Sequence, residues 1–242
     1  MNRYYYDLHT HSSLSPCADN DNTPYNLVGM AVLSGINILA LTDHNTCKNC
    51  PAFFAAAKQY GIIAVAGMEL TTAEEIHIVC LFEELEQAMQ FSEEIDSRRI
   101  KIKNRTDIFG EQLIIGENDE VIGYEEYLLS NATTVSLDEV PGLVEKYGGV
   151  CFPAHIDRVA NSLIGILGDI PKTPQFNCFE IANAKKAPEI IKKYGLQGKK
   201  IIIDSDAHYL DGIRDKENYF DLDDEPYSSN KVRASLFKEL RG

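Results

Sequence analysis

All six histidines of this chain lie in short clusters that also contain acidic residues, and each cluster stands where a β-rich apolar run begins or ends. The clusters are Asp7–His11, Thr42–Asn45, Glu69 with His77, Pro153–Arg158 and Asp204–His208. Imidazole and carboxylate groups together are the ligands of borderline divalent cations. One such histidine alone is more often a hydrogen-bonded core or surface residue, but the whole set predicts a multinuclear metal site.

Short β-branched or aromatic runs alternate with helix-like stretches along the chain. Seven strands are expected, at about residues 4–8, 37–42, 62–67, 76–82, 149–154, 177–182 and 200–204. This alternation favours parallel β–α–β units, and a length of 242 residues suits a one-domain α/β barrel. The predicted fold class is α/β, an irregular seven-stranded β/α (TIM-like) barrel that forms a single domain over residues 1–242.

Capping and breaking residues place helices between these strands. Pro24 opens one helix that ends near Gly35. Ser136 and Glu139 form a capping-box pattern for a helix that ends at Tyr147. Further helices are expected over residues 51–60, 83–97, 187–194 and 230–240.

The stretch from about residue 98 to 134 breaks the alternation of strands and helices. Residues 113–123 resemble a β-hairpin around a polar turn. We interpret the stretch as an insertion. It either covers the mouth of a site or forms a plain surface excursion, and the sequence favours neither.

In barrels of this kind the chemistry gathers at the carboxyl ends of the strands. His9 and His11 follow the first strand, and their i, i+2 spacing puts both side chains on one face of an extended chain. The other clusters follow the second, third, fifth and seventh strands. Only His77 opens a strand, and it would reach the same rim through a tight return from Glu69. We therefore expect five clusters to converge on one rim.

The charge balance argues against one class of partner. The chain has 23 Lys and Arg residues against 37 Asp and Glu residues, a formal net charge of −14. Because sequence-independent nucleic-acid affinity comes from cations that neutralise phosphates, we expect no general grip on nucleic acid. No apolar stretch approaches the roughly 20 residues of a membrane span, and no targeting segment is visible. The expectation is a cytoplasmic protein without a membrane partner, whose oligomeric state stays open.

The six cysteines are expected to stay reduced in that compartment. Cys47 and Cys50 form a C-x-x-C pattern without the second pair of a zinc ribbon. We therefore expect two thiols in a loop rather than a structural zinc site or a redox pair. Cys80, Cys151 and Cys178 lie in apolar runs and are expected to be buried.

The motifs, in this order, resemble those of the polymerase and histidinol phosphatase (PHP) superfamily of metal-dependent phosphoesterases. The matching segments are Asp7–Ser12, Leu41–His44, Gly67–Glu69 with His77, His155, and Asp204–His208. The resemblance spans nearly the whole chain and implies a distorted seven-stranded barrel. It also implies two or three divalent metal ions, Mn²⁺, Zn²⁺ or Fe²⁺, at the carboxyl-terminal face. Since no polymerase or other appended domain is visible, the chain is similar to the stand-alone hydrolase members.

The resemblance also implies which residues hold the first two metal ions. The first would be held by His9, His11, Glu69 and Asp206. The second would share the bridging carboxylate and be held by Glu69, His77 and His155.

A third metal ion would be held by His44 and His208, with one more ligand from the loop after the first motif. Many members of the superfamily supply an aspartate or histidine there, but this chain has Pro16 and Cys17. Either Cys17 or Asp19 could take that place, so the occupancy of the third site stays open.

The expected chemistry is hydrolysis of a phosphate ester. Two cations about 3.5–4 Å apart lower the pKa of a bridging water and clamp the phosphoryl oxygens. The main role of Glu69 and Asp206 in this catalysis would be to bind the metal ions. Arg158, three residues after His155, could bind substrate phosphate bidentately. A structural salt bridge, for example to Asp157, has nearly equal weight.

Lys185 and Lys186 follow the sixth strand at the same predicted rim, as further phosphate ligands or as a solvated helix start. We expect a metal-dependent phosphoesterase that hydrolyses a small phosphomonoester or nucleotide with a metal-bridged hydroxide. The alternatives are a 3′–5′ exonuclease, a C–N hydrolase with a similar metal cluster, and a non-catalytic metal-binding regulatory module. The metal, the physiological substrate and the general acid stay open.

Overall fold

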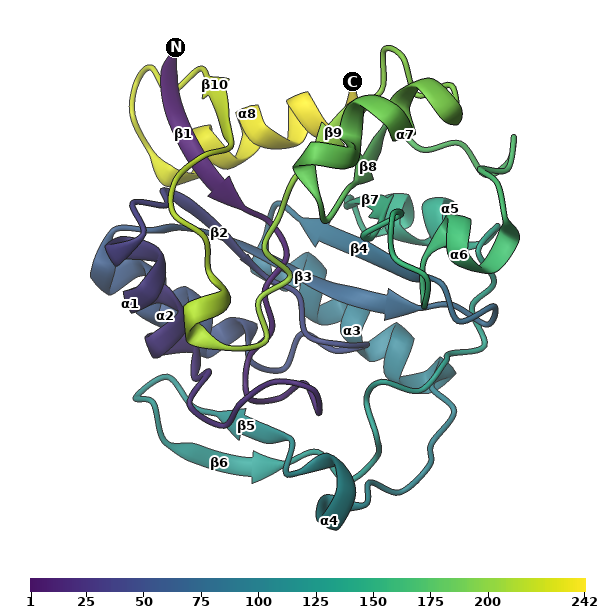
Figure 1. Cartoon of the computed structure of the whole chain (residues 1–242). Helices are drawn as coiled ribbons and strands as arrows, with labels where there is room; N and C mark the ends of the chain where they lie inside the picture. The colour runs from purple at the N-terminus through teal and green to yellow at the C-terminus, as the bar shows by residue number, and fades with distance from the viewer.

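The computed structural model describes every residue from 1 to 242, and its main strands curl into a half-barrel (Figure 1). These strands are β1 (Asn2–Asp7), β2 (Ile38–Leu41), β3 (Ile63–Thr71), β4 (His77–Phe82), β7 (Val150–Pro153), β8 (Cys178–Glu180), β9 (Lys200–Ile202) and β10 (Tyr219–Leu222). One sheet has the order β10-β1-β2-β3-β4-β7, and β8 pairs with β9. All seven expected strands are present, which confirms the α/β, barrel-like fold class; β10 was not expected.

The strand directions depart from the prediction at β4. Strands β1, β2 and β3 are parallel, but β4 is antiparallel to both β3 and β7, so the prediction of parallel units was wrong for β4, whereas the predicted tight return from Glu69 to His77 is present. The reason is the short connection over residues 72–76, because a parallel crossover needs a dozen or more residues. Strand β3 also runs past Glu69 to Thr71, which pairs with His77. The hairpin therefore puts His77 at the same end of the sheet as Glu69.

Buried carboxylates join β9 to β1 in place of a hydrogen-bonded strand ladder. The backbone N–H of Leu8 donates to Asp204 at 2.7 Å, and the backbone N–H of Ser205 donates to Asp7 at 3.1 Å. Both carboxyl groups are buried, and this burial raises the pKa of each above its ordinary value. Each of the two carboxylates thus holds the residue that follows the other one, at the rim of the half-barrel.

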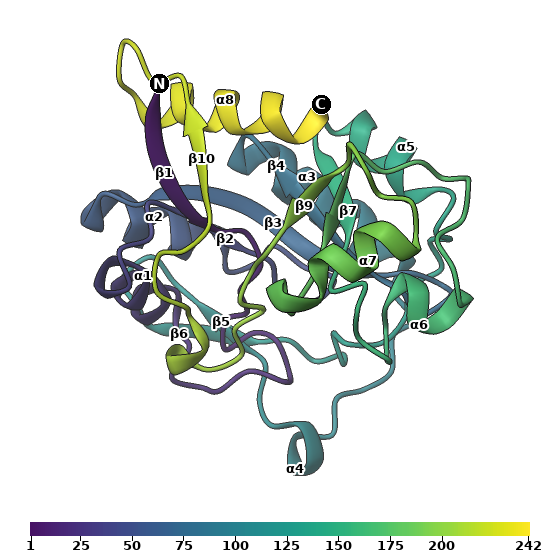
Figure 2. The same cartoon turned by 45° about the horizontal axis from the view of Figure 1, so that its top comes forward.

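Helices cover the outside of the strands and one end of the half-barrel (Figures 1 and 2). They are α1 (Pro24–Leu33), α2 (Cys50–Tyr60), α3 (Leu85–Arg98), α5 (Val140–Lys146), α6 (Leu163–Leu167), α7 (Ala187–Lys193) and α8 (Ser229–Arg241), with short 3₁₀ turns η1 (Ala184–Lys186) and η2 (Leu210–Gly212). The six expected helices are present, and α6 and the short α4 (Thr106–Phe109) are additional. Helix α5 begins later than its capping pattern predicted, because Ser136 and Glu139 bond to each other in a turn before Val140. None of the helices has the length and apolar run that crossing a membrane needs.

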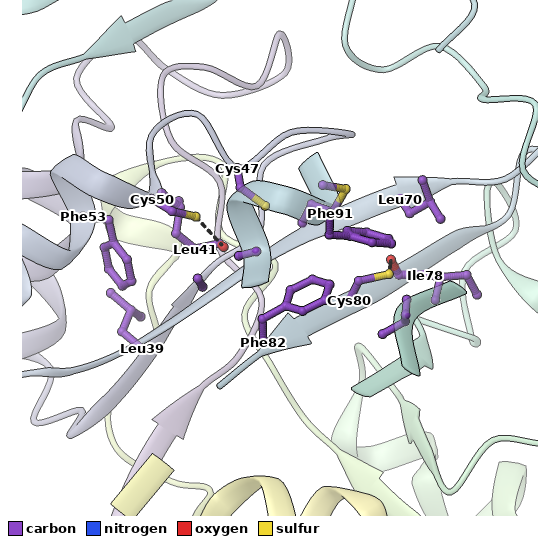
Figure 3. Close-up of a cluster of buried hydrophobic side chains, with 14 of the residues drawn as sticks. Leu39, Leu41, Cys47, Cys50, Phe53, Leu70, Ile78, Cys80, Phe82 and Phe91 are labelled. Carbon is purple, nitrogen blue, oxygen red and sulfur yellow. Dashed lines mark hydrogen bonds between the residues drawn. The ribbon is translucent and has the colours of Figure 1, made fainter. Parts of the chain in front are cut away.

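One apolar core lies between the sheet and its outer helices (Figure 3). Leu41 of β2, Phe82 of β4 and Phe91 of α3 are among its fully buried side chains. Cys47 and Cys50 are buried there as well. Cys47 lies in the loop before α2, as predicted, but Cys50 begins α2, so the prediction of a loop thiol was wrong for Cys50. Cys47 Sγ donates to the carbonyl of Gly67 at 3.1 Å, and burial raises the pKa of this thiol well above its ordinary value. The pair is a packing element.

A second apolar core fills the interior of the half-barrel. Leu236 and Phe237 of α8 pack there with Tyr4, Ile38 and Ile63, which lie in the first halves of their strands. Helix α8 therefore closes the amino-terminal end of the parallel strands, and the opposite end stays available for a site.

Residues 98–134 run along the lower edge of Figure 1. They contain α4 (Thr106–Phe109) and the expected hairpin, formed by β5 (Leu113–Ile115) and β6 (Val121–Tyr124). The Asn49 side chain holds the hairpin, because it donates to Leu113 O and accepts from Ile115 N. Ser13 O also accepts from Leu113 N, so the hairpin packs against the loop after β1.

Candidate metal centre

The structure brings the six histidines and two of the acidic residues together at the open rim. Three sets of donor atoms lie within 4.8 Å of one another: His9, His11, Glu69 with Asp206; His11, His44 with His208; and His44, Glu69 with His77. The eighth donor, His155, has its Nε2 3.0 Å from Glu69 Oε1. The set mixes imidazole nitrogens and carboxylate oxygens, as borderline divalent cations prefer.

Glu69 lies at the centre of this cluster. Its carboxylate oxygens lie within 3.4 Å of ring nitrogens from five histidines: His9, His11, His44, His77 and His155. Burial alone would raise the pKa of Glu69, but the surrounding histidines, His77 first, hold it well below its ordinary range. The residue is therefore ionised at neutral pH, and its two carboxylate oxygens face different histidines.

Two of the histidines are oriented by buried partners that the sequence motifs did not single out. His9 Nδ1 lies 2.8 Å from Glu180 Oε2, and neither side chain is exposed. This contact turns His9 Nε2 towards Glu69 and Asp206, at 3.4 and 3.3 Å. Burial lowers the pKa of His9, but Glu180, Asp206 and Glu69 raise it more, well above its ordinary value. In the sequence, the one feature that could have pointed to Glu180 is its position as an acidic residue in the apolar sixth run.

The second oriented ring is that of His11. Ser15 Oγ donates to Asp43 Oδ1 at 2.7 Å, so the 3.0 Å contact between His11 Nδ1 and Ser15 Oγ is a bond that the histidine donates. His11 Nε2 is left to face Asp206 Oδ1 at 3.1 Å and Glu69 Oε2 at 3.3 Å. Burial lowers the pKa of His11, but the two carboxylates raise it to about 9.

Two donors adopt a backbone conformation that L-residues rarely take. His155 has φ of 29° and Asp206 has φ of 51°. Non-glycine residues with positive φ cost conformational energy and collect at functional sites. The Nδ1 atom of His155 is buried and makes no hydrogen bond within the protein, and the Nδ1 atom of His44 is buried 3.0 Å from Glu69 Oε2. The donor chemistry, the strain and these ring nitrogens all fit a metal centre.

A cavity of about 680 Å³ opens beside the cluster. Six of the eight donors line it, and the remaining walls come from Cys17, Ser130 and the loop Asp157–Asn161. Ser130 belongs to the 98–134 segment, so this segment contributes to the wall of the cavity. The Val159 side chain is 90% exposed beside the same opening. The cavity is therefore lined by charged and imidazole groups of the donor cluster, with the apolar Val159 at its edge.

Arg158 points into this cavity. Its Nη1 lies 2.6 Å from Asp206 Oδ2, and the side chain is 45% exposed. It does not pair with Asp157, whose carboxylate accepts backbone N–H groups from Ala182 and Asn183. The arginine thus combines an ion pair to a candidate ligand with access to solvent.

Of the other predicted phosphate ligands and third-metal ligands, only one lies beside the cavity. Lys185 and Lys186 are exposed on η1 and do not line the cavity. Asp19 is also exposed and belongs to none of the three donor sets. Cys17 does line the cavity, and its Sγ lies 3.2 Å from His44 Nε2. The structure therefore places Cys17, not Asp19, next to the donor set of His11, His44 and His208.

Comparison with curated proteins finds short but clear matches. The chain is 43% identical over 79 residues to a 5′–3′ exoribonuclease of Haemophilus influenzae, a match that covers 31% of this chain and 28% of that protein. It is 30% identical over 99 residues to the uncharacterized protein MJ1587 of Methanocaldococcus jannaschii, covering 37% of this chain and 58% of that one. In both cases the match spans less than two thirds of the relative's length.

Solved structures with the same fold include the lesion-specific endonuclease PfuEndoQ from Pyrococcus furiosus. It has a TM-score of 0.67 at 17% identity, and the match covers 98% of this chain and 56% of that chain. An amidohydrolase from Chromobacterium violaceum has a TM-score of 0.57 at 19% identity, covering 98% and 96%. At these identities the likeness is one of fold.

A family model specifies the relationship further. The model of the PHP domain matches residues 7–195, which include every donor except Asp206 and His208. The match covers most of the chain and agrees with the resemblance seen in the motifs and with the His/Glu/Asp cluster of the structure. The chain therefore belongs to the PHP domain family.

Proposed function

We propose that this protein is a phosphoesterase that hydrolyses a small phosphomonoester or a nucleotide. The observation that carries the proposal is the cavity in which Arg158 lies directly beside the donor cluster. Divalent cations, when bound there, would activate a water and neutralise charge on the phosphoryl oxygens. A guanidinium at the same place is suited to bidentate contact with phosphate.

The donor sets support a definite assignment of ligands. We assign the first metal ion to His9, His11, Glu69 and Asp206. We assign the second to Glu69, His77 and His155, and a third to His44 and His208. Arg158 would leave Asp206 for the substrate, because an Asp206 oxygen that binds a cation no longer holds the guanidinium as strongly.

The dimensions and charge of the site favour a small substrate. A cavity of about 680 Å³ falls in the range of pockets that bury small molecules. The net charge of −14 provides little of the cationic surface that tracks a nucleic-acid backbone. An apolar rim residue, Val159, could contact the organic part of such a substrate.

A second candidate function is that of a nuclease that admits one terminal nucleotide. The specific observation in its favour is the likeness to a protein named a 5′–3′ exoribonuclease, 43% identical over 79 residues. The 3′–5′ polarity considered from sequence has no such support. A C–N hydrolase is favoured only by the fold shared with an amidohydrolase.

A metal-supplemented assay separates these candidates. Purified protein with Mn²⁺, Zn²⁺ or Fe²⁺ is offered small phosphomonoesters, mononucleotides, and single-stranded RNA and DNA at physiological salt. We expect phosphate release from the small esters and little cleavage of the oligonucleotides. His9→Ala, prepared in parallel, reports any contaminating activity. Processive digestion of RNA by the wild type alone, without phosphate release from small esters, would replace the first proposal with the second.

A further inference from the structure

The loop after β1 is tied down on both sides of Cys17. On one side, Ser15 Oγ donates to Asp43 Oδ1 at 2.7 Å. On the other side, the backbone N–H of Asp19 donates to the carbonyl of His208 at 3.0 Å. Asp43 immediately precedes His44 in the chain. Cys17 is therefore held between the segments that supply His44 and His208, which together with His11 form one of the three donor sets.

The thiol of Cys17 has a direct partner in that set. Its Sγ lies 3.2 Å from His44 Nε2, and His44 belongs with His11 and His208 to donor atoms within 4.8 Å of one another. A tetrahedral zinc ion separates its sulfur and nitrogen ligands by about 3.5 Å, given the usual bond lengths. The observed separation therefore needs only a small adjustment for both atoms to bind one ion.

The remaining candidates for this position are excluded by their surroundings. Asp19 Oδ1 accepts the backbone N–H of Asp21 at 2.9 Å in an exposed turn. The other five cysteines are buried or half-buried, whereas Cys17 is exposed and lines the cavity. Cys17 is thus the one thiol that a metal ion in this cavity can reach.

We propose that Cys17 is a thiolate ligand of the third metal ion, beside His44 and His208. The inference rests on the proposed metal centre and deepens it. On binding, the thiol loses its proton to solvent and the sulfur forms a bond to the cation. Because thiolate is a soft ligand, this position selects Zn²⁺ over Mn²⁺, which prefers oxygen ligands.

Cobalt substitution tests the bond itself. Co²⁺ added to metal-free protein should produce visible d–d bands together with a near-ultraviolet sulfur-to-cobalt charge-transfer band. Cys17→Ser should abolish the charge-transfer band and retain d–d bands from the other two sites. Cys151→Ser, a half-buried thiol on β7, is the matched control and should keep both signals.

The outcomes distinguish the two proposals. Absence of all cobalt bands would overturn the metal centre and, with it, the role of Cys17. Bands from bound cobalt without charge transfer, or with charge transfer that persists in Cys17→Ser, would overturn only the thiolate ligand.

Alkylation gives an independent readout in the wild-type protein. Mass spectrometry of metal-free protein treated with iodoacetamide should show Cys17 as the reactive thiol, because it is the exposed one. Zn²⁺ should slow this reaction about tenfold or more, since a coordinated thiolate is a poor nucleophile, while Mn²⁺ should protect much less. Equal reactivity of Cys17 with and without Zn²⁺ would contradict the proposal.

Discussion

The donor cluster has a buried side and an open side, and the two are held in different ways. On the buried side, His9 and His11 are not exposed at all, and Glu180 and Ser15 fix their rings. On the open side, the side chains that face the cavity are more exposed, 12% for His77, 22% for His208 and 45% for Arg158.

This difference indicates a division of tasks. A ring that is held by a buried acceptor keeps one orientation whether or not a substrate is present. Groups at the open side can change partners when a metal ion or a substrate arrives. We therefore expect the buried side to set the geometry of bound metal ions and the open side to select the substrate.

The largest effect is expected where the two sides meet, at Glu69. Replacing it by Gln removes a charge that five histidines surround, so both metal ions that we assign to it should be depleted. Activity should fall at least about 1,000-fold. Metal analysis of purified Glu69→Gln, with circular dichroism to verify the fold, checks this. Full metal content in the variant would contradict a bridging role.

The buried side is tested next through Glu180. Glu180→Gln keeps the size of the side chain but weakens its hold on His9 Nδ1, so metal affinity should fall about 10- to 100-fold. Competition with a chromophoric chelator measures the affinity. Glu189→Gln, an exposed position on α7, is the matched control and should bind metal like the wild type. If both variants match the wild type, the buried side does not set the geometry.

On the open side, Arg158→Ala should lower kcat/KM about 10- to 100-fold while metal content and Tm stay near those of the wild type. Lysine should not rescue it, because a point charge lacks the planar fork of a guanidinium. Lys185→Ala, outside the cavity, should remain within about twofold. Loss of metal or unfolding in Arg158→Ala would make its ion pair with Asp206 structural.

The smallest effect concerns pH in the metal-free protein. Burial lowers the pKa of His11 and His44, but nearby carboxylates, and for His44 also Cys17, raise it to about 9 from an ordinary 6.5. A raised histidine pKa stabilises the fold fully below about pH 6.5, and this contribution is lost as the pH rises through about 9. Tm should therefore fall by a few degrees over that window in chelator. A rising Tm there would show that the two rings are neutral in the metal-free protein.

Bound metal should reverse this trend. The ligands must be neutral imidazoles, so metal uptake at neutral pH should release protons from His11 and His44. Titration in weakly buffered solution measures that release. The affinity for metal should rise with pH until about 9, which distinguishes ligand protonation from a general loss of stability.

The sequence by itself determined the features that depend on local spacing. Alternating apolar runs and capping residues placed the seven expected strands and six expected helices. The histidine clusters indicated which residues meet, because the ends of parallel strands come together once the sheet curls. The 98–134 segment could be predicted as an insertion because it interrupts the alternation of strands and helices, and its predicted hairpin is present.

Only the tertiary structure decided what depends on contacts between distant segments. Glu180 resembles any acidic residue at a strand end until it meets His9, 171 residues away. Likewise Lys185 and Arg158 were both candidate phosphate ligands from the sequence, but only Arg158 lines the cavity. The choice between Cys17 and Asp19 depended on which side chain the loop turns inwards. The physical reason is that strand and helix periods are local, whereas side-chain direction at the rim follows from how the whole sheet closes.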